Sequence, residues 1–195
     1  MIHSVLRFLA GQLNVYIDHL NETNPVPSPV VILQSPNADE NKLKELNNLL
    51  LFLVNISEES SMKNLPDYRI INDNTVTYKN PALNLNIFVV ISAFMANYEN
   101  ELRYLAHSIT YFQGKTIFTQ NDVANMTDGL PDDFRICVDL YSLTFEQINY
   151  IWSTLGGKQH PFVCYKIRIL EIERESVAET RGVIRQIRID EAPGT

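Results

Sequence analysis

The most regular pattern of apolar and polar positions lies between residues 143 and 172 and predicts a helix followed by a long strand. Thr144 and Gln147 are placed to form a capping box, in which each side chain bonds the backbone N–H of the other residue. Gly156 and Gly157 end the helix, because glycine adopts the left-handed conformation of a helix C-cap. Pro161 prevents a return to helix, so residues 162–172 are predicted to be a strand. Apolar residues recur at helical spacing and predict one buried face: Phe145, Ile148, Ile151, Trp152 and Leu155.

Two further helices follow from the same periodicity. The first is predicted to start with Ser4 as its N-cap and to end near residue 20. The second begins at Ala93 or Asn97 and ends at Gly114, where glycine stops the pattern.

Strands are predicted where short β-rich runs are bounded by turn residues. Residues 48–56 and 85–91 are apolar on both faces, which is typical of central strands. Residues 134–140 alternate and predict a strand with one face on the core. Shorter strands are expected at 30–33 and 183–189, whereas residues 57–80 have the polar composition of long loops, with one short strand at 75–78.

The order of these elements predicts an α+β fold. Strands both precede and follow the helices, and several connections late in the chain have hairpin length. We expect a mixed, largely antiparallel sheet with two or three packed helices. A chain of 195 residues suits a single domain, 1–195, that buries about 70% of its unfolded surface.

Charge and hydropathy narrow the function classes. The formal charge of −7 disfavours nucleic acid as a partner, because phosphate binding needs clustered Lys and Arg. The longest apolar runs are too short to span a bilayer, so membrane insertion is not expected. The N-terminal stripe is interrupted by polar residues, unlike a signal peptide, and synthesis in the cytoplasm is therefore expected.

Candidate chemistry is weak throughout the sequence. Cys137 and Cys164 are expected to be free thiols, with a disulfide left open. The four histidines show no metal-ligand spacing, and no catalytic, cofactor or metal site is expected. His160 and Cys164 are about 13 Å apart if both lie along one strand, too far for a nucleophile and its base. The Gly156-Gly157-Lys158 sequence follows a helix, so a helix C-cap explains it better than a phosphate loop.

Arg181, Arg185 and Arg188 are the most informative charges in the sequence. On a strand, Arg181 and Arg185 share one face and Arg188 takes the other. One interpretation is a solvated edge strand that its charges protect from pairing. The alternative is an edge that pairs with a strand of another subunit, which makes these arginines the candidate partner interface.

Several segments of the chain resemble the tail-terminator (cap) proteins of phage-tail-like contractile injection systems. The resemblance rests on NPALNLNIFVVISAF (80–94), YFQGKTIFT (111–119), LTFEQINYIWSTLGGK (143–158) and YKIRIL (165–170), in that order. It covers roughly residues 80–172, and its specificity lies in the series of motifs rather than in any one of them.

The resemblance implies a structural protein without enzymatic activity. Such a protein forms a ring, a hexamer, at the distal end of the inner tube and contractile sheath, stops their polymerisation and anchors sheath to tube. Its partners are further copies of itself, the inner tube protein and the sheath protein, and it is a component of an injection particle that is extracellular or membrane-anchored. Two alternatives stay open: a monomeric adaptor that binds a partner by strand addition, and a small enzyme.

Overall fold

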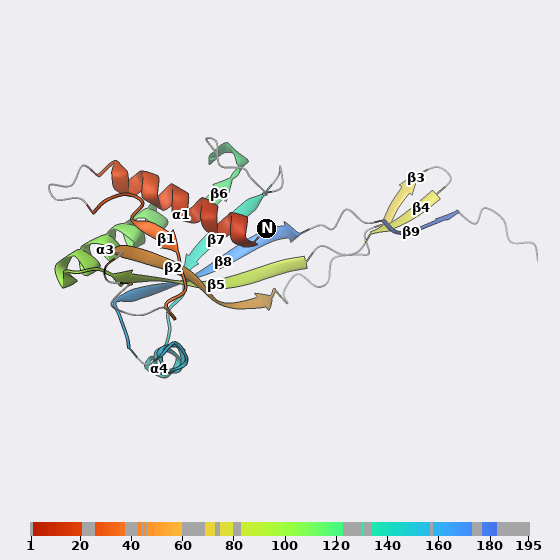
Figure 1. Cartoon of the computed structure of the whole chain (residues 1–195). Helices are drawn as coiled ribbons and strands as arrows, with labels where there is room; N and C mark the ends of the chain where they lie inside the picture. The colour runs from red at the N-terminus through yellow and green to blue at the C-terminus, as the bar shows by residue number, and fades with distance from the viewer. Residues whose placement is uncertain are drawn as a thin grey trace, which may run out of the picture.

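The computed structural model describes residues 2–20, 26–37, 43, 45, 47–59, 69–72, 75–79, 83–122, 130, 134–156, 158–172 and 177–182. These residues form three α-helices, a short 3-10 helix (Gln120–Asp122), a six-stranded sheet and a separate three-stranded sheet, as Figure 1 shows. The helices are α1 (Ile2–Asp18), α3 (Tyr98–Gly114) and α4 (Phe145–Thr154). The strands of the larger sheet are β1 (Val31–Leu33), β2 (Asn48–Glu58), β5 (Leu83–Phe94), β6 (Ile117–Thr119), β7 (Arg135–Leu140) and β8 (Phe162–Ile172).

The strand order of the larger sheet is β1-β2-β5-β8-β7-β6. Only β1 and β2 pair in parallel, and every other neighbouring pair in this sheet is antiparallel. The predicted α+β fold with a mixed, largely antiparallel sheet is therefore confirmed. Of the two strands predicted to be central, β5 lies inside the sheet. β2 has a described neighbour on both sides only over residues 49–51.

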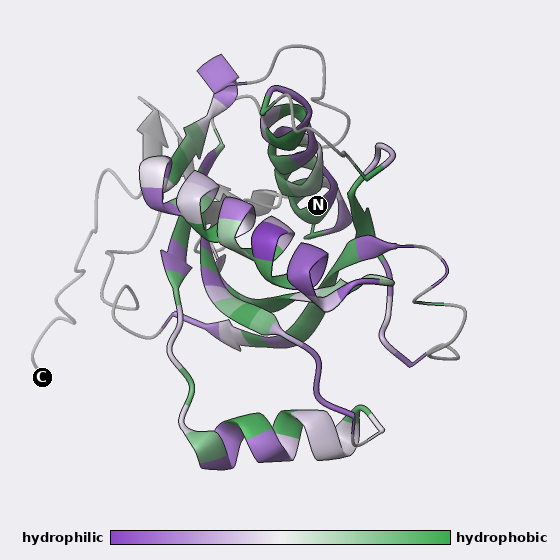
Figure 2. Ribbon diagram, turned by 90° about the vertical axis from the view of Figure 1, so that its left-hand side faces the viewer, coloured by the Kyte–Doolittle hydropathy of each residue, from purple (hydrophilic) through white to green (hydrophobic). Residues whose placement is uncertain are grey.

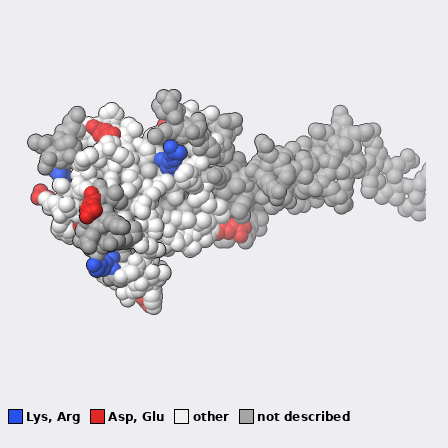
Figure 3. Space-filling view, in the orientation of Figure 1, with Lys and Arg blue, Asp and Glu red and all other residues white. Residues whose placement is uncertain are grey.

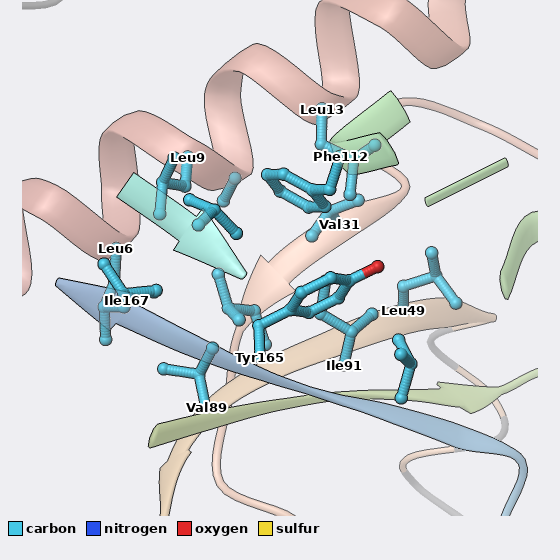
Figure 4. Packing of buried hydrophobic residues seen from close by; sticks show 14 of the residues in the cluster. Leu6, Leu9, Leu13, Val31, Leu49, Val89, Ile91, Phe112, Tyr165 and Ile167 are labelled. Atoms are coloured by element: carbon cyan, nitrogen blue, oxygen red, sulfur yellow. The ribbon is translucent and has the colours of Figure 1, made fainter. Parts of the chain in front are cut away.

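The main core lies between the sheet and the helices α1 and α3, which cover the same face (Figure 1). In Figure 4, Leu6, Leu9 and Leu13 of α1 point toward residues of the sheet such as Val89 and Ile167. Aromatic rings extend this core: Phe8 of α1 packs edge-to-face on Phe118 and Phe134.

A side-chain amide on α1 completes the hydrogen bonding of the short edge strand β1. Asn14 Oδ1 accepts the Val31 N–H at 2.8 Å, and Asn14 Nδ2 donates to the Val31 carbonyl at 2.9 Å. This pair of bonds reproduces the exchange that a neighbouring strand would make. The amide therefore joins α1 to the edge of the sheet.

A smaller hydrophobic cluster lies on the opposite face of the sheet. It contains Leu50 and Phe52 of β2, Val90 and Phe94 of β5, and Cys164 of β8, together with Leu43. Figure 2 shows that α4 is the helix on this side, joined to the sheet by two extended connections. A single helix of this length leaves part of the face uncovered.

The second sheet contains β3 (Arg69–Asn72), β4 (Thr75–Lys79) and β9 (Val177–Gly182), in the order β3-β4-β9. Both pairings are antiparallel. Figure 1 shows this sheet apart from the six-stranded sheet. Whether both sheets belong to a single domain, 1–195, stays a prediction.

Several sequence-based expectations need correction. Residues 57–80 were expected to be loops with a strand at 75–78; that strand is present as β4, but β3 and the end of β2 also lie in this segment. A charged turn was expected around residues 173–179, but residues 177–179 belong to β9, which runs to Gly182. The predicted strand 183–189 lies outside the described residues. Ser4 is inside α1 rather than at its N-cap. In β4 and β9, strand pairing overrides the local preference for a turn or loop.

Candidate functional site: an apolar groove and an open strand edge

Helix α4 has the predicted start and stop. Thr144 Oγ1 accepts the Gln147 N–H at 3.2 Å, and Gln147 Oε1 accepts the Thr144 N–H at 3.0 Å. Gly156 follows the helix with φ 108°, a left-handed conformation that side chains disfavour. The interpretation of Gly156-Gly157-Lys158 as a helix C-cap rather than a phosphate loop is consistent with this geometry.

The predicted apolar stripe of α4 is buried at only one position. Trp152 is 5% exposed and packs against Phe162, with 5.4 Å between ring centroids. Ile148, Ile151 and Leu155 are half-buried, but Phe145 is 92% exposed. The expectation of a fully buried stripe is therefore wrong, because the sheet contacts α4 mainly through the turn that carries Trp152.

An apolar groove lies between α4 and the sheet, and we call it the α4 groove. It has a volume of about 270 Å³. Phe88, Cys164 and Tyr141 of the sheet side line it, and the Phe88 and Tyr141 rings meet at 5.0 Å. The remaining lining residues come from β2, from the connection to α4 and from α4 itself: Val54, Asn55, Leu143, Gln147, Tyr150 and Ile151.

Charged residues border this apolar region on the same face of the sheet. Arg168 Nη2 lies 2.8 Å from Asp139 Oδ2, and Lys166 Nζ lies 3.5 Å from Glu59 Oε2. The charges on these neighbouring strands are therefore paired with one another. An apolar centre with a polar border is compatible with a protein–protein contact.

The edge of the sheet beside the α4 groove is open. β1 pairs with β2 only from Leu49 to Leu51, but β2 continues to Glu58. Among the described strands, none pairs with the outer side of residues 52–58, which we call the β2 open edge. Three apolar side chains on it are exposed: Leu53 at 41%, Val54 at 37% and Ile56 at 37%.

The lining of the α4 groove includes the thiol of Cys164. Burial raises the pKa of the Cys164 thiol to about 11, so the thiol stays protonated and unreactive at neutral pH. His160 is buried elsewhere, stacked on Phe94 at 4.2 Å and with Nδ1 3.9 Å from Glu101 Oε1. Cys137 and Cys164 are both free thiols in this fold, so the two are not joined by a disulfide.

The described part of the chain was expected to hold no metal site and no membrane span. It contains no cluster of three or more His, Cys, Asp and Glu side chains that could hold a metal ion. None of its helices combines the length and the apolar character that a membrane crossing requires.

The arginines predicted as a partner interface are only partly placed. Arg181 lies in β9, opposite Val76 of β4, so it belongs to the three-stranded sheet. Arg185 and Arg188 lie outside the described residues. Sequence reasoning missed both the α4 groove and the β2 open edge. For the β2 open edge, the sequence offered one signal: the apolar run 48–56 is longer than the run 30–33, so the second strand can cover only part of the first.

The chain matches known proteins in family and in fold. The family model of the Pvc16 N-terminal domain matches residues 4–186. The sheath/tube terminator of the PVC extracellular contractile injection system, in its extended state, has a similar fold, with a TM-score of 0.57 and 11% identity over 98% of this chain and 64% of that chain. The tube-terminating cap of the anti-feeding prophage, AFP, has a TM-score of 0.57 and 10% identity over 94% of this chain and 58% of that chain.

This chain therefore spans less than two thirds of the length of either solved terminator. No curated protein sequence matches it.

Proposed function

Because the chain belongs to the Pvc16 N-terminal domain family, we propose that it is a structural subunit that caps the inner tube and contractile sheath of a phage-tail-like injection particle. The family match, which covers residues 4–186, carries this proposal. The likeness in fold to two tube terminators supports it.

In this proposal the subunits form a closed, hexameric ring on the distal end of the tube. The ring stops polymerisation and anchors the sheath to the tube when the sheath shortens. A closed ring requires two different, complementary surfaces on each subunit, because its contacts are heterologous. Contacts with tube and sheath require further surfaces. The exposed apolar side chains around the α4 groove and along the β2 open edge offer two such surfaces on one subunit.

The partners in this proposal are further copies of the chain, the inner tube protein and the sheath protein. The chain has no enzymatic activity of its own, is made in the cytoplasm and then becomes part of the particle, which is extracellular or membrane-anchored. The PVC relative is part of an extracellular injection system, which supports the extracellular case.

A second candidate function is a monomeric adaptor that binds one partner by strand addition. The unpaired outer side of β2 favours it, since an exposed strand edge is a template for another strand. An adaptor binds as a single copy, whereas a cap binds as a ring.

Polymerisation of the inner tube protein with increasing amounts of this chain tests the proposal. We expect tubes that become shorter as the molar ratio rises, measured by negative-stain electron microscopy. Tubes of unchanged length with unchanged ends would contradict the cap function.

The double variant Phe145→Ala/Tyr150→Ala removes two of the most exposed apolar side chains of α4 and is expected to weaken capping. Val15→Ala, on the exposed side of α1, is the matched control and should cap like the unchanged chain.

A further inference from the structure

The start of α4 presents a large aromatic side chain to the solvent in a fixed position. Phe145, the first residue of the helix, is 92% exposed. The residue before it, Thr144, forms the capping box with Gln147, so the helix begins at a defined place. An aromatic side chain on a rigid support is the kind of anchor that carries much of the binding energy in a protein–protein contact.

The α4 groove has the size and the chemistry to receive such a ring. Its volume is about 270 Å³. An apolar cavity of about 150 Å³ is already large enough for a benzene ring. Phe88 and Tyr141, whose rings meet edge to face, offer aromatic edges and faces to a third ring. None of the described residues that line the groove is charged, so the groove fits an uncharged, apolar side chain.

Phe145 and the α4 groove lie on different sides of the same helix. Three residues of α4 line the groove: Gln147, Tyr150 and Ile151. At about 100° per residue, these three positions lie between about 120° and about 160° around the helix axis from Phe145. A subunit with this helix therefore does not place its own Phe145 in its own groove. The ring and the groove face different directions, as the two sides of a head-to-tail contact do.

The net charge of the chain favours an uncharged contact between copies. The formal charge is −7, so copies repel one another where acidic surfaces meet. In Figure 3, most of the surface around α4 carries neither acidic nor basic side chains. On the same face of the sheet, Arg168 is paired with Asp139 and Lys166 with Glu59. Two copies that meet at the α4 groove therefore bring together mainly uncharged side chains.

We propose that Phe145 of one copy inserts into the α4 groove of the next copy and anchors the contact between ring neighbours. The occupant is a second copy of this chain, because the chain itself supplies both an exposed aromatic ring and an apolar groove of sufficient size. A side chain that fits a pocket elsewhere on the same kind of molecule makes a head-to-tail contact, which closes into a ring when the rotation between copies allows it. This inference rests on the proposed ring and names the contact that holds its neighbours together.

Cross-linking of two cysteine variants with a short bismaleimide tests the contact. One variant carries Asn149→Cys, one helical turn after Phe145 on the exposed side of α4, and the other carries Asn55→Cys, an exposed residue that lines the groove. Both variants also carry Cys137→Ser, whereas Cys164 is buried and stays protonated at neutral pH. A cross-linked dimer is expected from the mixture and from neither variant alone, because the contact is heterologous.

Further variants make the cross-linking specific. A chain that carries both Asn149→Cys and Asn55→Cys should give a ladder of cross-linked products up to the size of the ring. Val54→Cys in place of Asn55→Cys provides a second position in the groove. Val15→Cys in the same place is the control and should not cross-link, because Val15 is exposed on α1, on the opposite side of the sheet from α4 (Figure 2).

Truncation of the aromatic ring gives a second, independent readout. Phe145→Ala should keep the circular dichroism spectrum of the unchanged chain, because the side chain is solvated in the subunit. We expect it to weaken the association between copies by roughly tenfold or more, measured by native mass spectrometry over a range of concentrations. Phe145→Leu keeps an apolar side chain and should associate more tightly than Phe145→Ala. Tyr98→Ala removes an aromatic side chain that is 63% exposed at the start of α3; it is the matched control and should associate like the unchanged chain.

The outcomes separate this inference from the proposed function. Rings of Phe145→Ala that form as readily as those of the unchanged chain, or rings without a cross-link from either groove position, overturn the inference but leave the cap function. Cross-linking of Asn149→Cys to tube or sheath protein, in place of a second copy, also overturns the inference. Failure of the unchanged chain to self-associate, both in solution and on tubes, overturns both.

Discussion

Single polar residues decide how the edge of the six-stranded sheet is held. Asn14 supplies the two hydrogen bonds that a further strand would give to Val31, and Asn48 Nδ2 donates to the carbonyls of Pro29 and Val30 at 2.6 and 3.2 Å. In the sequence these residues are isolated asparagines, one in a helical stripe and one at the start of an apolar run. Their roles depend on contacts between distant segments and could not be predicted from local pattern.

Asn14→Ala is expected to lower the free energy of unfolding by about 2 kcal/mol. The substitution leaves the Val31 N–H and C=O without a partner, and an unsatisfied, partly buried backbone group costs about 1–3 kcal/mol. Urea denaturation followed by circular dichroism measures the effect. Asn14→Asp keeps an acceptor for the Val31 N–H, so its stability should lie between those of Asn14→Ala and the unchanged chain. Equal stability of these three proteins would contradict the role of the amide.

The buried Cys164 thiol predicts a loss of stability at alkaline pH. Burial raises the pKa of this thiol from 9.0 to about 11. Between these values the unfolded chain releases a proton that the folded chain keeps, so the contribution is fully present below pH 9 and is lost as the pH rises through 11. The stability difference between the unchanged chain and Cys164→Ser should narrow by about 1 kcal/mol or more between pH 8 and 11. A difference that stays constant over this range would contradict the burial argument.

At the scale of elements, the sequence predicted which helices and strands form better than it predicted which of their side chains are buried. The helices, the capping box and the central strands are strongly periodic and are formed largely as predicted. The orientation of α4 was not predictable, because a stripe of apolar residues indicates a contact but not whether the contact comes from the same molecule. Phe145 and Trp152 belong to the same predicted stripe, yet one is exposed and the other buried.

Trp152 and Phe145 are therefore expected to respond very differently to truncation. Trp152→Ala removes the main contact between α4 and the sheet and should destabilise the monomer by about 3–5 kcal/mol. Phe145→Ala should change the stability by less than about 0.5 kcal/mol, because the side chain is solvated. Thermal unfolding of both variants measures the two stability losses. Equal losses would mean that Phe145 is buried in the monomer.

At the scale of the whole molecule, two unequal sheets and one partly uncovered face distinguish this chain. The six-stranded sheet is closed by α1 and α3 on one side, but α4 leaves apolar surface on the other. The three-stranded sheet was not predicted, since its strands are short and lie in polar sequence whose pairing depends on residues far apart in the chain. These uncovered surfaces are what a subunit of a closed assembly requires.

We propose above that many copies of this chain act together as one cap at the end of a tube. Cryo-electron microscopy of tubes assembled from the inner tube protein in the presence of this chain tests it most directly. We predict one closed ring of this chain on one end of each tube, with the tube not extending beyond the ring. Bare tube ends, or copies of the chain bound singly along the tube wall, would contradict the claim.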